Sequence, residues 1–360
     1  MPEMPLLFDA HTDLSLNAIE FNRDSRQAVA LIRQGEAGME DHKARGNNTV
    51  SFPDMRRGNV GLCVATQIAR GQQVANKSVA SWNGPEIAWA ITQAQLAWYQ
   101  EMQRQKQLEL IKTSRRLEWL AGKWIAGEAA KLPIGFVLSL EGADSLVTLD
   151  HLQTAYGYGL RLIGPAHYGN GFYAPGTGAE GGFTARGKDL LAEMDRLKMI
   201  LDVTHLTDEG FDEALEIYQG PIWASHSNCR ALVDDQRQQN DDQIKRLIER
   251  GAVIGMAFDA WMMIPNWIRG ESQPEEMGVK IETIVDHIDH ICQLASNAKH
   301  VMIGSDLDGG FGTEQGPADL DTIADLQTLP ALLTDRGYST DDVDNIMHGN
   351  CLEFLLKHLP

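Results

Sequence analysis

Residues 6–14 read LLFDAHTDL, in which a short apolar run, Leu6–Ala10, leads into histidine and aspartate. Short apolar runs that end in polar or small residues recur along the chain. Because such runs between turn signals are typical of buried strands, each is predicted to form a strand. The other seven runs are Val60–Thr66, Ile134–Leu140, Leu160–Gly164, Met199–Val203, Ile222–Ala224, Ala252–Ala257 and Val301–Gly304.

Between these runs lie stretches with the apolar spacing of amphipathic helices. They are Glu86–Ile125, Gly187–Leu197, Asp208–Tyr218, Asp241–Arg250 and Val279–Ala295. Strands that alternate with helices indicate parallel βαβ units, and about eight such units favour a closed (β/α)8 TIM barrel over an open sheet. The predicted fold class is therefore α/β. No low-complexity linker divides the chain, so residues 1–360 are expected to form a single domain.

Three stretches do not fit the alternation: 23–54, 168–187 and 261–277. They are predicted to be loops, the first with a short helix, and loops that follow the strands of a barrel lie over its C-terminal face, where active sites sit. The third stretch reads WMMIPNWIRGESQPEEM. Its two tryptophans, two prolines and several charges predict a lid or a contact surface.

The composition excludes several classes of protein. The 360 residues include 31 lysines and arginines against 50 aspartates and glutamates, which gives a formal charge of −19. Neither nucleic acid nor an anionic membrane is an expected partner, because both require a basic surface. With 43% hydrophobic and 22% charged residues, the chain is expected to be globular. The four cysteines lie far apart without a CxxC pair, which excludes a disulfide scaffold and a cysteine zinc finger.

Segments that direct a protein to a membrane are also missing from the sequence. The N-terminus MPEMPLLFDAHTD has no basic segment followed by a long apolar run, so no secretory signal is expected. No stretch approaches the roughly 18 uninterrupted apolar residues of a membrane span. A cytoplasmic location is therefore predicted.

Reactive side chains lie just past the ends of several predicted strands: His11, Asp13, Glu141, His205, His226 and Asp306. Each is a weak signal by itself, since a lone histidine or carboxylate is more often structural. The carboxyl ends of barrel strands meet at one rim, however, so these side chains are expected to lie together. Their equivalent positions predict a metal site.

The types of side chain indicate which metal. Imidazole and carboxylate donors without a thiolate suit Zn²⁺ or another divalent ion. Three imidazoles and three carboxylates exceed the needs of one tetrahedral ion, so two ions per chain are predicted. A carboxylate that bridges two ions would suit hydrolysis.

Six segments, in order, resemble the membrane dipeptidase (renal dipeptidase, peptidase M19) family of the amidohydrolase superfamily. They are FDAHTDL, SLEGAD, LDVTHLTD, ASHSNCRALVDDQRQQNDDQI, IVDHIDHI and IGSDLDGG. The similarity runs from about Leu6 to the C-terminal HGNCLEFL and is strongest from Gly187 onward. It implies a (β/α)8 barrel and a zinc-dependent metallo-dipeptidase, which hydrolyses a small dipeptide with a free C-terminal carboxylate. A homodimer, and a C-terminal residue that is achiral or of D configuration, are further implications.

The resemblance also implies a role for each residue of the metal site. His11 and Asp13 would bind the first zinc, and His205 and His226 the second. Glu141 would bridge the two ions. The implied reaction is attack on the peptide carbonyl by a hydroxide held between the ions.

Three further residues are assigned to the substrate by the same resemblance. Asp306 would act as general base and pass its proton to the leaving amine, with Asp308 as the alternative. His167 would bind the substrate and stabilise the oxyanion. Arg237 would bind the C-terminal carboxylate, with Arg230 as its rival.

The sequence departs from the family pattern near the substrate. Aromatic residues tend to follow the second strand in relatives, whereas this chain has GLCVATQIARG with Gln67. The stretch AFDAWMMIPNW after the seventh strand is also unusual. These differences leave side-chain specificity open. The anchor and secretion signals of mammalian relatives are not seen, so membrane attachment is not expected.

Other interpretations of the pattern remain open. The same metals would suit the opening of a lactone or a cyclic amide, and a non-catalytic accessory protein could keep the barrel. His287 and His290 lie three apart in a predicted helix, where they are expected on the barrel exterior in surface or structural roles. The sequence has no GxSxG motif, which would indicate a serine hydrolase.

Overall fold

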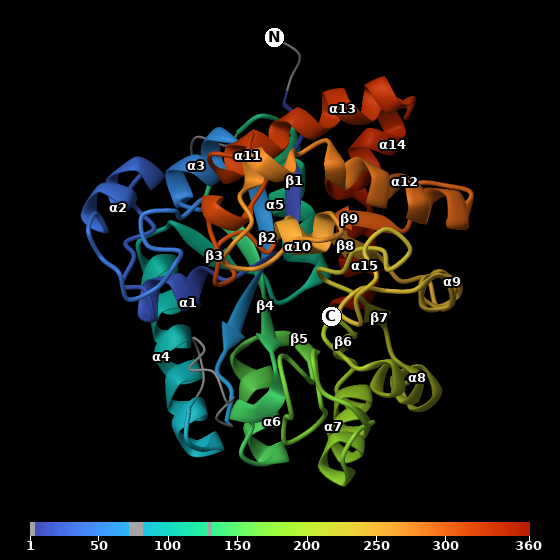
Figure 1. The fold of residues 1–360 in the computed structure, drawn as a ribbon. Coiled ribbons are helices and arrows are strands. Elements are labelled where there is room, and N and C mark those ends of the chain that lie inside the picture. Colours follow the sequence, from blue (N-terminus) through green and yellow to red (C-terminus); the bar gives the residue numbers. More distant parts are fainter. Residues whose placement is uncertain (1–3, 72–81, 129–131) are drawn as a thin grey trace.

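The apolar runs form a parallel sheet that curls into a nearly closed barrel (Figure 1). The computed structural model describes residues 4–71, 82–128 and 132–360. The barrel strands follow the order β7-β6-β5-β4-β2-β1-β9-β8, and β3 pairs with β4 outside this path. The strands are β1 (Leu7–Thr12), β2 (Val60–Ile68), β3 (Leu108–Leu110), β4 (Ile134–Glu141), β5 (Leu160–Gly164), β6 (Ile200–Asp202), β7 (Ile222–Trp223), β8 (Ile254–Met256) and β9 (Val301–Ile303).

The barrel closes between β7 and β8. A parallel bridge joins Ala224 to Ile254. The amide of Ala224 donates to the carbonyl of Val253 at 3.1 Å, and the amide of Gly255 donates to the carbonyl of Ala224 at 2.8 Å. The predicted (β/α)8 TIM barrel is confirmed.

This closure leaves no room for a side chain at two glycines. A Cβ at Gly255 or at Gly304 would lie 1.8 Å from the carbonyl oxygen of Ser225. Neither glycine has a positive φ, so space rather than backbone conformation requires glycine at both positions. Because Ser225 precedes His226, this packing fixes the backbone that carries His226.

Helices surround the strands, with α4, α6, α7, α8 and α9 around the outside of the barrel in Figure 1. Capping side chains start many of them; in α9, Asn240 and Gln243 form a capping box, and Ile244 and Leu247 turn inward. The α-helices are α1 (Leu14–Ile19), α2 (Val29–Gly35), α3 (Phe52–Arg57), α4 (Pro85–Arg104), α5 (Ser114–Ile125), α6 (Leu149–Tyr158), α7 (Ala185–Arg196), α8 (Asp208–Ile217), α9 (Asp241–Glu249), α10 (Ala260–Met263), α11 (Pro274–Met277), α12 (Thr283–Ala295), α13 (Leu329–Arg336), α14 (Thr340–Asp344) and α15 (Asn350–His358). Shorter helical turns are η2 (Ala143–Ser145), η3 (Thr313–Gln315), η4 (Ile323–Thr328) and η5 (Asn345–Gly349).

The prediction of one helical stretch over Glu86–Ile125 is wrong. The stretch contains α4, the short strand β3 and α5. Lys106 adopts a left-handed φ of 59°, which ends the first helix, and Thr113 caps the second by accepting from the amide of Arg116. Apolar spacing alone did not separate the two helices, although the capping threonine marks the break.

The three predicted loops carry little regular structure. Residues 23–54 include α2 and the start of α3, and residues 261–277 include α11 and most of α10. The loop after β5 folds back on itself, with bridges from Tyr168 to Thr177 and from Asn170 to Pro175. All four cysteines are buried and free. Among the described residues, no helix is both long enough and apolar enough to cross a membrane.

Candidate active site

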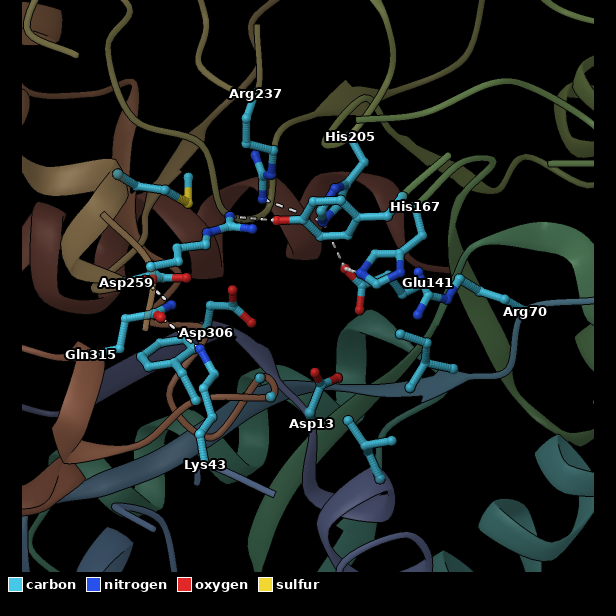
Figure 2. A pocket seen from close by; sticks show the side chains of 18 of the residues that line it. Asp13, Lys43, Arg70, Glu141, His167, His205, Arg237, Asp259, Asp306 and Gln315 are labelled. Carbon is cyan, nitrogen blue, oxygen red and sulfur yellow. Dashed lines mark hydrogen bonds and ion pairs between the residues drawn. The ribbon is translucent and has the colours of Figure 1, made fainter. Parts of the chain in front are cut away.

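The side chains predicted at the strand ends do meet at the C-terminal end of the barrel. Figure 2 shows Asp13, Glu141, His167, His205 and Asp306 around one cavity. His11 and His226 are almost fully buried and are not among the residues that line the cavity. The residues come from six places: the end of β1 supplies His11 and Asp13, and the end of β4 and the segments that follow β5, β6, β7 and β9 supply one side chain each.

Glu141 stands at the centre of this cluster. Its Oε1 lies 3.2 Å from His205 Nε2, 3.4 Å from His226 Nε2 and 3.7 Å from His167 Nε2. Its Oε2 lies 3.4 Å from His11 Nε2. The two oxygens of one carboxylate therefore face different imidazoles.

Asp13 and Asp306 extend the cluster on the side of His11. His11 Nε2 lies 3.8 Å from Asp13 Oδ1 and 3.7 Å from Asp306 Oδ1. Potential ligand atoms fall into three overlapping groups: His11 with Glu141 and His226, Glu141 with His167 and His205, and His11 with Asp13 and Asp306. The cluster offers more donor atoms than one tetrahedral ion takes.

Hydroxyl groups orient two of the imidazole rings. Thr177 Oγ1 lies 2.8 Å from His205 Nδ1, and Ser225 Oγ lies 2.8 Å from His226 Nδ1. The Nε2 atoms of the two histidines then face the cluster, only 3.2 Å apart. Such support of the outer ring nitrogen is typical of metal-binding histidines.

Two buried aspartates hold the strand ends that carry these residues. Asp9 accepts hydrogen bonds from the amides of His11 (3.2 Å) and Ser305 (2.8 Å), which ties the end of β1 to the segment after β9. Asp202 accepts from the amides of Thr204 (3.1 Å) and Ser225 (3.0 Å) and ties β6 to the segment after β7. These hydrogen bonds between neighbouring strands thus fix the positions of the potential metal ligands.

The electrostatics of the cluster favour a bound cation. Burial lowers the pKa of His11, but the carboxylates of Glu141, Asp13 and Asp306 outweigh burial and raise that pKa to about 10. Burial and the charge of Glu141 raise the pKa of Asp13 to about 6. Burial also raises the pKa of Asp306 well above its usual value.

The remaining imidazoles are poor proton acceptors. Burial, followed by the charge of Arg237, lowers the pKa of His205 to about 3, and burial holds the pKa of His226 well below its usual value. His11 Nε2 is buried and has no hydrogen-bond partner within the described ranges. Neutral imidazoles, crowded carboxylates and an unsatisfied ring nitrogen together fit divalent metal ions.

The backbone at the rim is locally strained. Left-handed backbone conformations, which residues other than glycine rarely adopt, occur at His205 (φ 69°), Asp306 (φ 57°) and Asp308 (φ 64°). Residues held in this way concentrate at functional sites.

The structure distinguishes the two arginines considered for the substrate. Arg237 is buried and lines the cavity, where it donates to Ser227 Oγ at 3.0 Å and to the carbonyl of His226 at 2.8 Å. Arg230 instead forms an ion pair with Asp208 at 2.7 Å and is not among the lining residues. The position of Arg237 is the better one for contact with a ligand.

The two aspartates of the GSDLDGG segment also differ. Asp308 accepts hydrogen bonds from the amide and hydroxyl of Thr49 (2.6 and 2.8 Å) and from the amide of Val50 (3.0 Å). These contacts anchor the loop, whereas Asp306 lines the cavity beside Glu141. Of the two aspartates, Asp306 is the one among the residues that line the cavity.

Several residues that line the cavity were not predicted from the sequence. They are Lys43, Arg70, Tyr168, Asp259, Arg269 and Gln315. Most come from long loops, where no strand end marks their position. Gln67, expected near the substrate, is fully buried away from the cavity, where it donates to the carbonyl of Thr92 and accepts from Tyr158 Oη.

His287 and His290 are outside the cluster, as predicted, but His287 is buried rather than exposed. Its Nδ1 accepts from the amide of Cys229 at 3.1 Å, and its Nε2 lies 3.0 Å from the carbonyl of Met263. His290 pairs with Asp241 at 2.7 Å. Both histidines have structural contacts.

Known proteins resemble this chain in sequence and in fold. Dipeptidase tcpJ of Claviceps purpurea (strain 20.1) is 29% identical over 229 residues, which cover 61% of this chain and 51% of that protein. An uncharacterized protein in the pqqA 5′ region of Klebsiella pneumoniae is 32% identical over 212 residues, 57% of this chain and 74% of that protein. The match spans about half the length of the fungal relatives.

Two solved structures superpose over nearly the whole chain. A metallo peptidase from Rhodobacter sphaeroides, liganded with a phosphinate mimic of the dipeptide L-Ala-D-Ala, gives a TM-score of 0.80 at 20% identity and covers 99% of this chain and 100% of its own. The dipeptidase AC, a metallo peptidase of family M19, gives 0.78 at 22% identity and 99% of each chain. At such identities the likeness supports the barrel fold.

The family itself is established by a match over almost every residue. The model of the family described as membrane dipeptidase (peptidase family M19) matches residues 1–357. The resemblance seen in the sequence motifs is thereby confirmed. This chain belongs to the membrane dipeptidase family, peptidase family M19.

Proposed function

We propose that this protein is a dipeptidase that binds two zinc ions and hydrolyses dipeptides with a free C-terminal carboxylate. The observation that carries the proposal is the position of Glu141, whose Oε2 faces His11 and whose Oε1 faces His205 and His226. Support comes from the family and from relatives that are named dipeptidases.

In this proposal the donors divide around Glu141. His11 and Asp13 would hold one ion, His205 and His226 would hold the other, and Glu141 would contribute to both. When bound, two such ions supply Lewis acidity, which activates water and polarises a scissile carbonyl.

Two residues of the chain act on the reacting atoms. Asp306 accepts a proton from the attacking water and delivers it to the leaving nitrogen, a role suited to a carboxyl whose pKa burial raises. His167 stays neutral because burial holds its pKa well below the usual value. It then donates a ring N–H to the oxygen on which negative charge develops.

Arg237 orients the substrate by its C-terminal carboxylate. Its guanidinium group reaches the cavity beside His205, with Nη2 3.4 Å from His205 Nε2. A planar guanidinium matches a carboxylate with two parallel hydrogen bonds. Binding at this end places the peptide bond toward Glu141.

The decisive test combines metal content with activity in the wild type and in Glu141→Gln. We expect about two zinc ions per chain and turnover of a mixed dipeptide library in the wild type, with both strongly reduced in the variant. Glu118→Gln, on the exposed face of α5, is the matched control and should behave as wild type.

Other outcomes would reject specific parts of the proposal. Two ions without cleavage of any dipeptide would point instead to lactones or cyclic amides as substrates. Protein that takes up no metal after reconstitution would refute the metal centre and favour an accessory role.

A further inference from the structure

Two cationic side chains enter the cavity from long loops. Lys43 comes from the loop that precedes α3, and Arg269 comes from the loop between α10 and α11. Within residues 4–71, 82–128 and 132–360, no carboxylate forms an ion pair with either one. Their charges are therefore available to a ligand.

Lys43 is held in place by a neutral partner. Its Nζ donates to Gln315 Oε1 at 2.6 Å, and Gln315 Nε2 in turn donates to Asp259 Oδ1 at 2.8 Å. Figure 2 shows this chain of contacts along one wall of the cavity. The glutamine orients the lysine without neutralising it.

Arg269 is held in place in a comparable way. Its guanidinium group lies 3.9 Å from the centre of the Trp261 ring and donates to Tyr168 Oη at 3.0 Å. The indole nitrogen of Trp261 donates to Asp259 Oδ2 at 2.6 Å. One buried aspartate thus positions both cations through uncharged side chains.

The cavity has a surplus of positive charge outside the proposed metal donors and Asp306. Its lining includes four cations, Lys43, Arg70, Arg237 and Arg269, against the single further carboxylate of Asp259. Such a surplus is unusual in a chain with a formal charge of −19. A dipeptide with neutral side chains adds one positive and one negative terminus and leaves the surplus unchanged.

We propose that the preferred substrates are dipeptides with an acidic side chain, aspartate or glutamate, and that Lys43 and Arg269 select that side chain. This inference rests on the proposed dipeptidase function and names its substrate class. Arg237 keeps the C-terminal carboxylate, so the additional carboxylate is the group that the two loop cations bind. A carboxylate and two cations of this kind form charge-assisted hydrogen bonds.

The test compares each acidic dipeptide with its amide of the same shape. We expect kcat/KM for Ala-Glu to exceed that for Ala-Gln, or kcat/KM for Glu-Ala to exceed that for Gln-Ala, by about tenfold or more. Which of the two pairs shows the difference depends on whether the cavity binds the acidic side chain at the C-terminal or the N-terminal position. Lys43→Gln and Arg269→Gln should each reduce this ratio by about threefold, because pairs at a partly exposed site are individually weak. The double variant should bring the ratio to within about twofold of unity.

Matched controls remove the same charges elsewhere. Lys245→Gln on α9 and Arg115→Gln on α5 change exposed residues outside the cavity and should leave the ratio unchanged. Lys43→Glu should reverse the preference toward Ala-Lys. Circular dichroism and thermal melting confirm that each variant is folded.

A binding measurement separates this inference from the proposed function. Calorimetry with Ala-Glu and Ala-Gln is done on the Asp306→Asn background, where turnover is expected to stop. If the wild type hydrolyses both dipeptides and their kcat/KM values differ by less than about twofold, the proposed substrate class is overturned, whereas the dipeptidase function stands. Tighter binding of Ala-Glu that the double variant abolishes, with no turnover by wild type, would reject the dipeptidase and keep the acidic ligand. Neither turnover nor preferential binding would overturn both.

Discussion

Arg237 is held by the protein through two of its guanidinium nitrogens. Nη1 donates to Ser227 Oγ and Nη2 donates to the carbonyl of His226, while Nε is buried without a hydrogen-bond partner in the described part of the chain. Nη1 and Nη2 each carry a second hydrogen, so the group can still donate two hydrogen bonds to a ligand carboxylate. The protein thus orients Arg237, and a substrate carboxylate would accept these remaining hydrogens.

Replacement of Arg237 by lysine should weaken binding of the substrate carboxylate. Lysine keeps the charge but loses the planar pair of donors, so we expect kcat/KM to fall by about tenfold or more, mainly through KM. The measurement compares each dipeptide with its C-terminal amide. The wild type should discriminate strongly between them and Arg237→Gln should not; equal discrimination by both proteins would exclude the proposed role.

Residues at strand ends could be predicted because barrel topology brings those ends together. His11, Glu141 and His226 are far apart in sequence, yet parallel strands place them side by side. Lys43 and Arg269 could not be predicted in this way. Their positions depend on the paths of long loops, which no periodic pattern records.

At the scale of elements, a histidine joins α12 to two loops of the C-terminal face. His287 accepts from the amide of Cys229 and contacts the carbonyl of Met263, at the start of the 261–277 loop. An amide can donate only to an unprotonated Nδ1, so the neutral ring with hydrogen on Nε2 fits both contacts. Burial accordingly lowers the pKa of His287 to about 4.

This pKa shift predicts how stability depends on pH. The unfolded chain binds a proton at His287 near pH 6.5, before the folded protein does. The contribution of the neutral His287 to the free energy of unfolding is therefore complete above about pH 6.5 and is lost as the pH falls toward 4, with a size of roughly 3 kcal/mol. Urea unfolding of wild type and His287→Gln should differ at pH 7 and converge near pH 4, whereas His290→Gln on the same helix should show a smaller effect. A constant difference across this range would contradict the assignment.

The closure of the barrel gives a second prediction at this scale. Gly255→Ala should destabilise the protein by about 1–3 kcal/mol, because the new methyl group meets the carbonyl of Ser225. Displacement of Ser225 by this methyl group should also weaken zinc binding, because His226 is the next residue in the chain. Gly122→Ala in α5 meets no atom within 4 Å and should be neutral or stabilising. Denaturant unfolding and zinc titration check both variants, and equal behaviour of the two would refute the steric argument.

For the whole molecule, the alternation of apolar runs and helical stretches predicted parallel βαβ units, and their number, about eight, favoured a closed barrel over an open sheet. The short strand β3 was missed because Glu109 separates its two leucines, so the segment contains no apolar run. The proposals that the chain is a single domain and forms a homodimer stay predictions, which limited proteolysis and light scattering would test.

Metal removal should affect the stability of the entire barrel. The proposed donors come from β1, β4 and the segments after β6 and β7, so bound ions connect strands around the circumference. Ions that bind only the folded state at a thousand times their Kd stabilise it by about 4 kcal/mol. We expect a chelator to lower Tm by several degrees and zinc to restore it, whereas magnesium, which prefers oxygen ligands, should not. Identical melting with and without zinc would argue against the metal centre.

The close contact of Ser225 with Gly255 and Gly304 has a consequence for how descendants of this chain can diverge. A side chain at either glycine would displace the carbonyl of Ser225, so selection is expected to reject single mutations at these two positions. Lys43 and Arg269, in contrast, sit on exposed loops where one nucleotide change can alter a charge without disturbing a strand. Selection can therefore vary the charges at the mouth of the cavity while the cluster around Glu141 is inherited unchanged.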